Sequence, residues 1–321
     1  MKYVGIGIAL AILAIGALFV IAYTINRSQT DKAFQLLEKI SKETGTVNVT
    51  WIKIESNLAE LRGINRRIIK IDYETSSQRQ EINLCMRCLK TAFSIIADVK
   101  NDLDSIEAHD ENITKSLQEL RGPNLPNWFY DYKDLRASIL EKDLEKVSKA
   151  REILDNMDLH FKFSKGFFEG MVVQLEMEEA LEYGMDNFVM KEYSKAREQL
   201  EKALEFNSKF KAYIGDIAKL ITFDYFDRIE SNSGKLKEII EKLIRACDLV
   251  KEGSYAEAKK LYEEAYGEYS SLERLNMGDL MSKNQEWWKK NVESIYADLK
   301  ELTREIEDLE HRAASLIEKY K

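Results

Sequence analysis

The residues of this chain that could take part in chemistry are few and scattered. Cys85 and Cys88 form a Cys-x-x-Cys pair, a spacing that binds zinc or performs thiol redox reactions in other proteins. A structural zinc ion needs four ligands, and no second cysteine pair or histidine cluster accompanies this one in the sequence. A redox pair needs a strand followed by a helix, and no such context surrounds it. We therefore expect both cysteines to be small apolar residues of a helix.

The three histidines do not form a recognisable catalytic or metal-binding arrangement. A metal site in a helical bundle needs Glu-x-x-His on two helices, and the nearest approach, Asp308 with His311, has no counterpart. The acidic group between Asp102 and Glu111 could attract divalent cations, but it fits a solvated helix face better. Phosphate-binding loops and common hydrolase motifs are missing from the sequence. The sequence thus predicts a protein without enzymatic activity, cofactor or metal.

The elements that carry these residues are expected to be long helices. The sequence has only two prolines, Pro123 and Pro126, and it is rich in Glu, Lys, Leu, Ile and Ala, which is typical of all-α proteins. Between residues 82 and 120, apolar residues alternate at spacings of three and four, a heptad seam interrupted only by Asp110. The seam residues are Ile82, Cys85, Leu89, Ala92, Ile96, Val99, Leu103, Ile106, Ile113, Leu117 and Leu120.

The same register extends upstream of this seam. Leu61, Ile64 and Ile68 keep the heptad phase, and the polar stretch between them and the seam contains no Gly or Pro. The sequence therefore predicts one continuous helix over 50–121, with a break near residue 75 as the alternative. The β-branched run 46–50 predicts a kink or a short extended segment.

A second heptad seam covers the C-terminal part of the chain. Its residues include Trp288, Val292, Ile295, Leu299, Leu302, Ile306 and Leu309. Both seams are buried most simply when the C-terminal helix packs back antiparallel on the first one.

An apolar segment over 3–25 contains no charged residue and is long enough to cross a bilayer as a helix. We expect it to be a retained single-pass anchor and not a cleaved signal, so the lipid bilayer is a predicted partner. Arg27 and the lysines after it favour a cytoplasmic body. Sequons at Asn26, Asn48 and Asn112 favour the opposite side. We place the body outside the cytoplasm, with the cytoplasm as the alternative.

Three segments of the region 128–278 share a pattern in which a small residue is followed four positions later by a large one. This spacing lets the two helices of a hairpin approach closely. The residues are Ala150 and Leu154 in the first copy, Ala196, Leu200 and Ala203 in the second, and Gly253, Tyr255, Ala258, Tyr262 and Ala265 in the third.

At these offsets the region resembles the tetratricopeptide repeat over about a quarter of the chain. The resemblance implies helical hairpins and a groove that binds peptides or partner proteins. The copies lie 46 and 62 positions apart and lack the proline that ends each repeat of that family, whose period is 34. We therefore expect degenerate hairpins, with an ordinary helical bundle as the alternative.

The predicted fold is all-α, with a transmembrane helix, a coiled-coil stalk, a head of helical hairpins and a C-terminal helix packed on the stalk. The predicted parts are an anchor over 1–27, the stalk over 28–122, a Pro-containing linker over 123–127, the head over 128–278 and the C-terminal helix over 279–321. A net charge of −8 without a basic run excludes nucleic acid as an expected partner.

The predicted function is that of a membrane-anchored, non-enzymatic scaffold or adaptor that binds a protein partner through its head. The alternative is a structural coiled-coil protein that self-assembles at the membrane or cell envelope. The seams are also compatible with a homo-oligomer.

Overall fold

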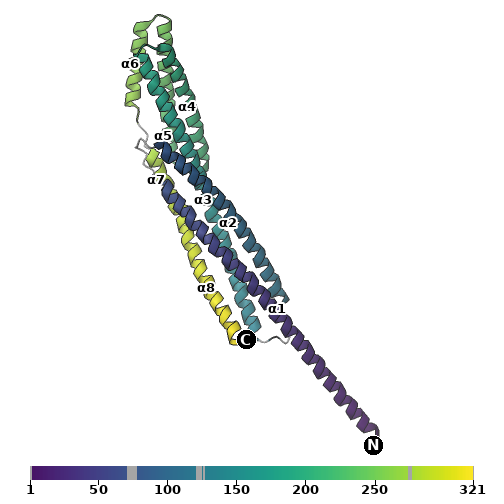
Figure 1. Cartoon of the computed structure of the whole chain (residues 1–321). Coiled ribbons are helices and arrows are strands. Elements are labelled where there is room, and N and C mark those ends of the chain that lie inside the picture. Colours follow the sequence, from purple (N-terminus) through teal and green to yellow (C-terminus); the bar gives the residue numbers. More distant parts are fainter. Residues whose placement is uncertain (1, 71–77, 121–124, 126, 274–276, 321) are drawn as a thin grey trace. The chain divides into compact units, whose positions relative to one another are not determined.

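The computed structural model of this chain describes residues 2–70, 78–120, 125, 127–273 and 277–320, with only the backbone described for 2–26, 29, 78, 277 and 320. All elements within these residues are helical, which confirms the all-α prediction (Figure 1). The helices are α1 (Lys2–Ile68), α2 (Gln78–Glu119), α3 (Asn127–Val189), α4 (Tyr193–Leu220), α5 (Tyr225–Lys251), α6 (Tyr255–Ser271), α7 (Met277–Trp288), the π-helical turn η1 (Lys289–Glu293) and α8 (Ser294–Tyr320).

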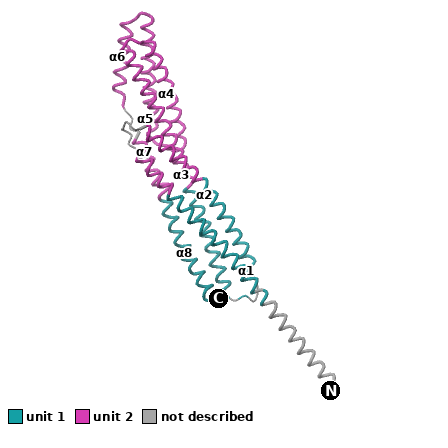
Figure 2. Tube along the Cα trace, in the orientation of Figure 1, with its two compact units in different colours: residues 1–59, 97–153, 294–321 teal, residues 60–96, 154–293 magenta. Residues whose placement is uncertain are grey.

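The chain divides into two compact units, coloured separately in Figure 2. Unit 1 consists of Met1–Ala59, Ala97–Ile153 and Ser294–Lys321, and unit 2 of Glu60–Ile96 and Leu154–Glu293. The predicted stalk, head and C-terminal helix follow one another along the sequence, whereas each unit combines stretches that are far apart in it. Each unit is described by itself below.

In unit 1, α1 and α2 are the two arms of an antiparallel hairpin, so the predicted continuous helix over 50–121 is wrong. Ion pairs join the two arms, Lys53 to Asp102 and Glu43 to His109. The residue number on α2 increases from one pair to the next while that on α1 decreases, so the arms run in opposite directions. The shared heptad register has a different cause from the one expected. Each arm must present its apolar seam to the same core, which sets the same pattern without any continuity between the helices.

The predicted interruption over 46–50 is also absent, because α1 is helical throughout this run. Thr46 Oγ1 donates to the carbonyl of Lys42 at 3.3 Å, and Thr50 Oγ1 donates to the carbonyl of Thr46 at 2.9 Å. These hydroxyl groups are satisfied by the preceding helical turn, and Val47 is buried in the core. Burial and local hydrogen bonding thus outweigh the weak helix propensity of β-branched residues.

The helix α8 packs against α3 within unit 1. Ion pairs connect Arg136 with Glu310, Lys142 with Glu305, and Lys149 with Asp298. The position on α8 falls as that on α3 rises, so the two helices are antiparallel. Thr303 of α8 also donates to Glu55 of α1 at 3.4 Å. The C-terminal helix therefore contacts the predicted stalk through α1, and it packs on α3, which we had assigned to the head.

In unit 2, two helical hairpins have the same turn geometry at positions 62 residues apart, α3–α4 and α5–α6. Lys191 and Gly253 take the left-handed conformation with φ of 65° and 83°. The amide that follows each of them closes the turn: Glu192 N–H donates to Asn187 O and Ser254 N–H to Leu249 O, both at 2.8 Å. This is the bond pattern of a Schellman C-cap, which ends one helix and lets the next one return.

The two hairpins of unit 2 share one apolar core. Leu181 of α3, Leu200 of α4, Leu243 of α5 and Ala265 of α6 belong to the same buried cluster. The hairpins are therefore packed on each other as a helical bundle, with the repeat-like small residues on the inner faces.

A search of the part of the chain that the structure describes finds no helix both long and apolar enough to cross a membrane. The predicted anchor over 3–25 falls on residues whose side chains lie outside that description.

Candidate functional site

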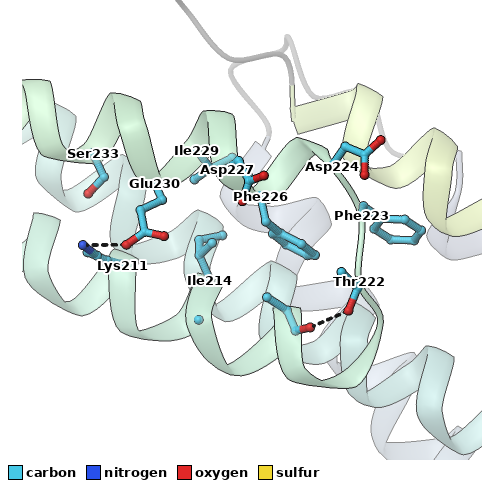
Figure 3. Close-up of a pocket in the computed structure, with 12 residues that line it drawn as sticks. Lys211, Ile214, Thr222, Phe223, Asp224, Phe226, Asp227, Ile229, Glu230 and Ser233 are labelled. Atoms are coloured by element: carbon cyan, nitrogen blue, oxygen red, sulfur yellow. Dashed lines mark hydrogen bonds and ion pairs between the residues drawn. The ribbon is translucent and has the colours of Figure 1, made fainter.

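A cavity of about 250 Å³ lies between the last turns of α4 and the first turns of α5, in unit 2 (Figure 3). Its apolar lining comes from Ile214 and Ala218 of α4 and from Phe226 and Ile229 of α5. The opposing helices are joined next to the cavity by a buried pair, because Asn207 Nδ2 donates to Ser233 O at 3.0 Å and Ser233 Oγ donates to Asn207 Oδ1 at 2.9 Å. We call this cavity the α4–α5 groove.

Acidic side chains line the α4–α5 groove together with one lysine. Asp224, Asp227 and Glu230 belong to the first part of α5 and the residue before it, and Lys211 belongs to α4 (Figure 3). Lys211 Nζ lies 2.9 Å from Glu230 Oε1, so this pair is neutralised within the groove. The remaining carboxylates, Asp224 and Asp227, are exposed and give the groove a negative character.

The local sequence explains why the groove is open. The helix α4 ends where Ile221 becomes extended, with φ −139° and ψ 124°. Gly215 and Ala218 are small and lie three positions apart on α4, and a Cβ added at Gly215 would meet nothing within 4 Å. The short side chains leave space that the larger residues of α5 do not fill. Asp227 lies in the first turn of α5, where the helix dipole favours a carboxylate.

A buried polar cluster in unit 2 surrounds His160. Its Nε2 lies 2.8 Å from Asn65 Oδ1, and its Nδ1 lies 3.1 Å from Asn284 Oδ1. The ring of Trp288 packs at a centroid distance of 4.6 Å. Burial lowers the pKa of His160 to about 3, so the imidazole is neutral. A neutral, enclosed histidine between two amides ties three helices together and has no access to a substrate.

A second buried polar cluster lies in unit 1. Trp51 Nε1 donates to Asp143 Oδ1 at 3.2 Å, and Lys146 Nζ lies 4.0 Å from the centroid of the Trp51 ring and 3.2 Å from Glu55 Oε1. Burial raises the pKa of Asp143 to about 6 and lowers that of Lys146. Asp110, the one polar residue of the first heptad seam, belongs to the same region, since the charge of Asp143 acts on it.

The predicted repeat residues are placed mostly in the core of unit 2. Its buried cluster includes Ala196, Leu200, Ala203, Ala258 and Ala265, and Tyr262 packs against it. Gly253 supplies the positive φ of the α5–α6 turn. Tyr255 is 64% exposed and does not join the core. Ala150 and Leu154 are buried in the middle of α3, so no hairpin turn accompanies the first copy.

The predicted seam residues are almost all buried. Those with less than a tenth of their surface exposed are Ile82, Leu89, Ile96, Leu103, Leu117, Val292, Leu299, Leu302 and Ile306. Leu309 is partly buried. Leu117 of α2 and Ile306 of α8 lie in one cluster of unit 1, which brings the two seams together in a common core.

The cysteines are free thiols, with Cys85 and Cys247 buried. Burial raises the pKa of the Cys85 thiol to about 12, which disfavours the thiolate needed for redox or metal chemistry. Among the described residues, no group of three or more His, Cys, Asp or Glu side chains is arranged to hold a metal ion.

Sequence reasoning missed the α4–α5 groove and the partners of His160. The small pair Gly215 and Ala218 on one helix face was the available signal for the groove. No pattern links His160 with Asn65 and Asn284, because these residues come from distant parts of the chain.

Comparison with protein-family models, with curated proteins and with solved structures finds no match for this chain. The resemblance to the tetratricopeptide repeat therefore gains no support from a family model.

Proposed function

We propose that this protein is a membrane-anchored adaptor without enzymatic activity, which binds a basic and apolar segment of a protein partner in the α4–α5 groove. The observation that carries the proposal is the composition of this groove. Apolar side chains form its lining, and the carboxylates of Asp224 and Asp227 stand beside it, with no ion pair to either among the residues that the structure describes.

The chemistry of the groove favours one kind of occupant. An aliphatic or aromatic side chain of the partner would replace water against Ile214 and Phe226, at roughly 25 cal/mol per Å² of apolar surface buried. A neighbouring Lys or Arg of the partner would then meet Asp224 or Asp227. Charge complementarity of this type increases the rate and the specificity of association more than the affinity.

Support for the non-enzymatic part of the proposal comes from the positions of the unusual titratable groups. Asp110, Asp143 and His160 have the large pKa shifts that often mark catalytic sites. All three are buried within helical cores and lie outside the groove. Their environment is that of structural polar residues.

The anchor is supported by the uncharged segment over 3–25 and by the helical backbone that continues from it to Ile68. Extraction of native membranes with alkaline carbonate tests it. The full chain should remain in the membrane fraction, whereas a chain without residues 1–27 should be released. Labelling of intact cells with a membrane-impermeant amine reagent tests the proposed extracytoplasmic position of the body, through Lys195 and Lys259.

Photo-crosslinking tests the groove directly. A photoreactive amino acid in place of Ala218 should link the full chain, in native membranes, to one specific protein. The same amino acid in place of Gly267, on the exposed side of α6, is the control and should give no such product.

A charge-reversal pair decides whether the crosslink depends on the groove. The double variant Asp224→Lys/Asp227→Lys should abolish it, and raised salt should weaken it. The matched variant Glu257→Lys/Glu263→Lys on α6 should leave it unchanged. Equal crosslinking in both double variants, or from both labelled positions, would refute the proposed site.

A second candidate function, structural self-assembly, is favoured by one observation in unit 1. Val49 and Ile52 are 68% and 69% exposed and lie three positions apart on α1, where they share a helix face. Sedimentation of the detergent-solubilised full chain tests it. A dimer that becomes monomeric on Val49→Lys/Ile52→Lys would favour self-assembly, and a monomer at high concentration would exclude it.

A further inference from the structure

Asp110 has an unusual position in the core of unit 1. It occupies a seam position of α2 between Ile106 and Ile113, which are both buried, and it is itself only 4% exposed. Neither of its carboxyl oxygens has a hydrogen-bond partner within the described structure. A carboxylate in such a place would lose its hydration without any compensating contact.

Two buried cations of α3 in unit 1 are engaged by other groups. Arg136 of α3 donates to Glu310 of α8 at 2.9 Å and to the hydroxyl of Tyr132 at 3.0 Å. Lys146 of α3 contacts Glu55 and the Trp51 ring of α1, as described above.

The charged groups around this region are mostly acidic. They include Glu43 and Glu55 on α1, Glu107 and His109 on α2, Arg136, Asp143, Lys146 and Arg151 on α3, and Glu307 and Glu310 on α8, with Arg151 paired to Glu107 at 3.0 Å. Of these, Asp143 and Glu107 act most directly on Asp110, and both disfavour its negative charge. Burial and these two charges raise the pKa of Asp110 to about 8.

We propose that Asp110 makes unit 1 a proton-responsive bundle, in which α2 packs closely on its neighbours while Asp110 is protonated and separates from them when Asp110 ionises. The neutral carboxyl group can stay in the apolar seam at modest cost. The carboxylate must gain water, and it can do so only if α2 moves outward. A change of pH near neutrality would thus alter the packing of the unit that follows the proposed anchor, independently of the α4–α5 groove.

Hydrogen–deuterium exchange of the full chain in lipid nanodiscs tests the proposal. Opening of α2 exposes Asp110, which then releases its proton. The equilibrium constant for opening should therefore increase about tenfold per pH unit between pH 5.5 and 7.5. Peptides from 103–117 should lose protection by this factor, after correction for the intrinsic exchange rate. In Asp110→Asn the dependence on pH should disappear, because the amide has the same shape and no proton to lose.

Two further measurements make the result decisive. Asp98→Asn removes an exposed carboxylate from the same helix, and this variant should keep the wild-type pH dependence. The infrared spectrum of the wild type should show a protonated carboxyl group at pH 7 that is lost at pH 9.5, which needs no variant to fold. Protection independent of pH in the wild type, an equal slope in Asp110→Asn, or the lack of the infrared band would each overturn the proposal.

Discussion

Replacement of Gly184 by alanine should destabilise unit 2, although alanine is the better helix former. Gly184 lies at the point where α3 approaches α4. A Cβ placed there would be 2.7 Å from Leu200 Cγ and 2.8 Å from Leu200 Cδ2. Leu200 is fully buried in the core, so its side chain has little room to move. The two helices must therefore separate, or Leu200 must leave its preferred rotamer.

Two opposing contributions set the size of this effect. Overpacking of a close-packed core costs about 1–3 kcal/mol, and alanine gains about 1 kcal/mol over glycine inside a helix. The net expectation for Gly184→Ala is a loss of up to about 2 kcal/mol, or up to roughly 4–8 °C in Tm for a unit of this size. Gly267→Ala on α6 is the matched control, because a Cβ there would meet nothing within 4 Å. It should gain about 0.5–1 kcal/mol.

Calorimetry of the full-length variants in detergent measures both changes against the wild type. Replacement by alanine should lower the Tm of unit 2 at Gly184 and raise it at Gly267. If Gly184→Ala is as stable as Gly267→Ala, then α3 and α4 do not approach as closely as described here, and the interpretation of Gly184 as a packing residue is wrong.

Three further predictions concern other parts of the structure. Lys191→Gly should stabilise unit 2 by about 1 kcal/mol, because the lysine has a left-handed φ of 65°. Gly253→Ala should destabilise unit 2 by about 1 kcal/mol, because it places a side chain at a φ of 83°. Urea unfolding measures both changes. His160→Leu should lower stability by about 2–4 kcal/mol at pH 8, because Asn65 and Asn284 lose their shorter hydrogen bonds and keep only contacts of 3.4 Å. At pH 5 the loss should be about 2 kcal/mol smaller, because burial lowers the pKa of His160 from 6.5 to about 3 and the wild type is then destabilised by protonation of the unfolded chain. Since the native pKa of Asp110 is raised from 3.8 to about 8, the folded state binds this proton more tightly, so the unfolding free energy should fall from pH 5 to 8, on the order of 3 kcal/mol, in a pH series of chemical unfolding.

The helical class and most core positions could be predicted from the sequence. Ile96, for example, belongs to a series of apolar residues at heptad spacing, and it is buried. This spacing places the apolar residues on one face of the helix, and that face is the one that packs in the core. The position of the turn between α1 and α2 could not be predicted from the heptad pattern. The register of α1 continues into α2 because both arms face one core, and the stretch 71–77 contains neither Gly nor Pro to mark a turn.

The candidate sites depended on contacts that no local pattern contains. Asp110 could be recognised as an exception within the seam, but the pattern does not reveal that nearby cations are engaged by other acids. His160 looked isolated in the sequence, and it meets Asn65 and Asn284 only after folding. The α4–α5 groove depends on the distance between two helices. The small residue Gly215 is compatible with a groove at this place, but it does not determine that distance.

The repeat-like hairpins explain why a partner would bind outside the core of unit 2. The ring of Tyr262 on α6 stacks on Phe188 of α3 at 4.3 Å, and Arg197 of α4 pairs with Asp248 of α5 at 2.9 Å. Each hairpin thus contacts the other through both of its helices. The inner faces, which a tetratricopeptide array would offer to a peptide, are used for the shared core. The α4–α5 groove lies outside the cluster that forms this core. Its exposed carboxylates, Asp224 and Asp227, can change without loss of packing, whereas Ile214 and Phe226 of its lining are themselves buried.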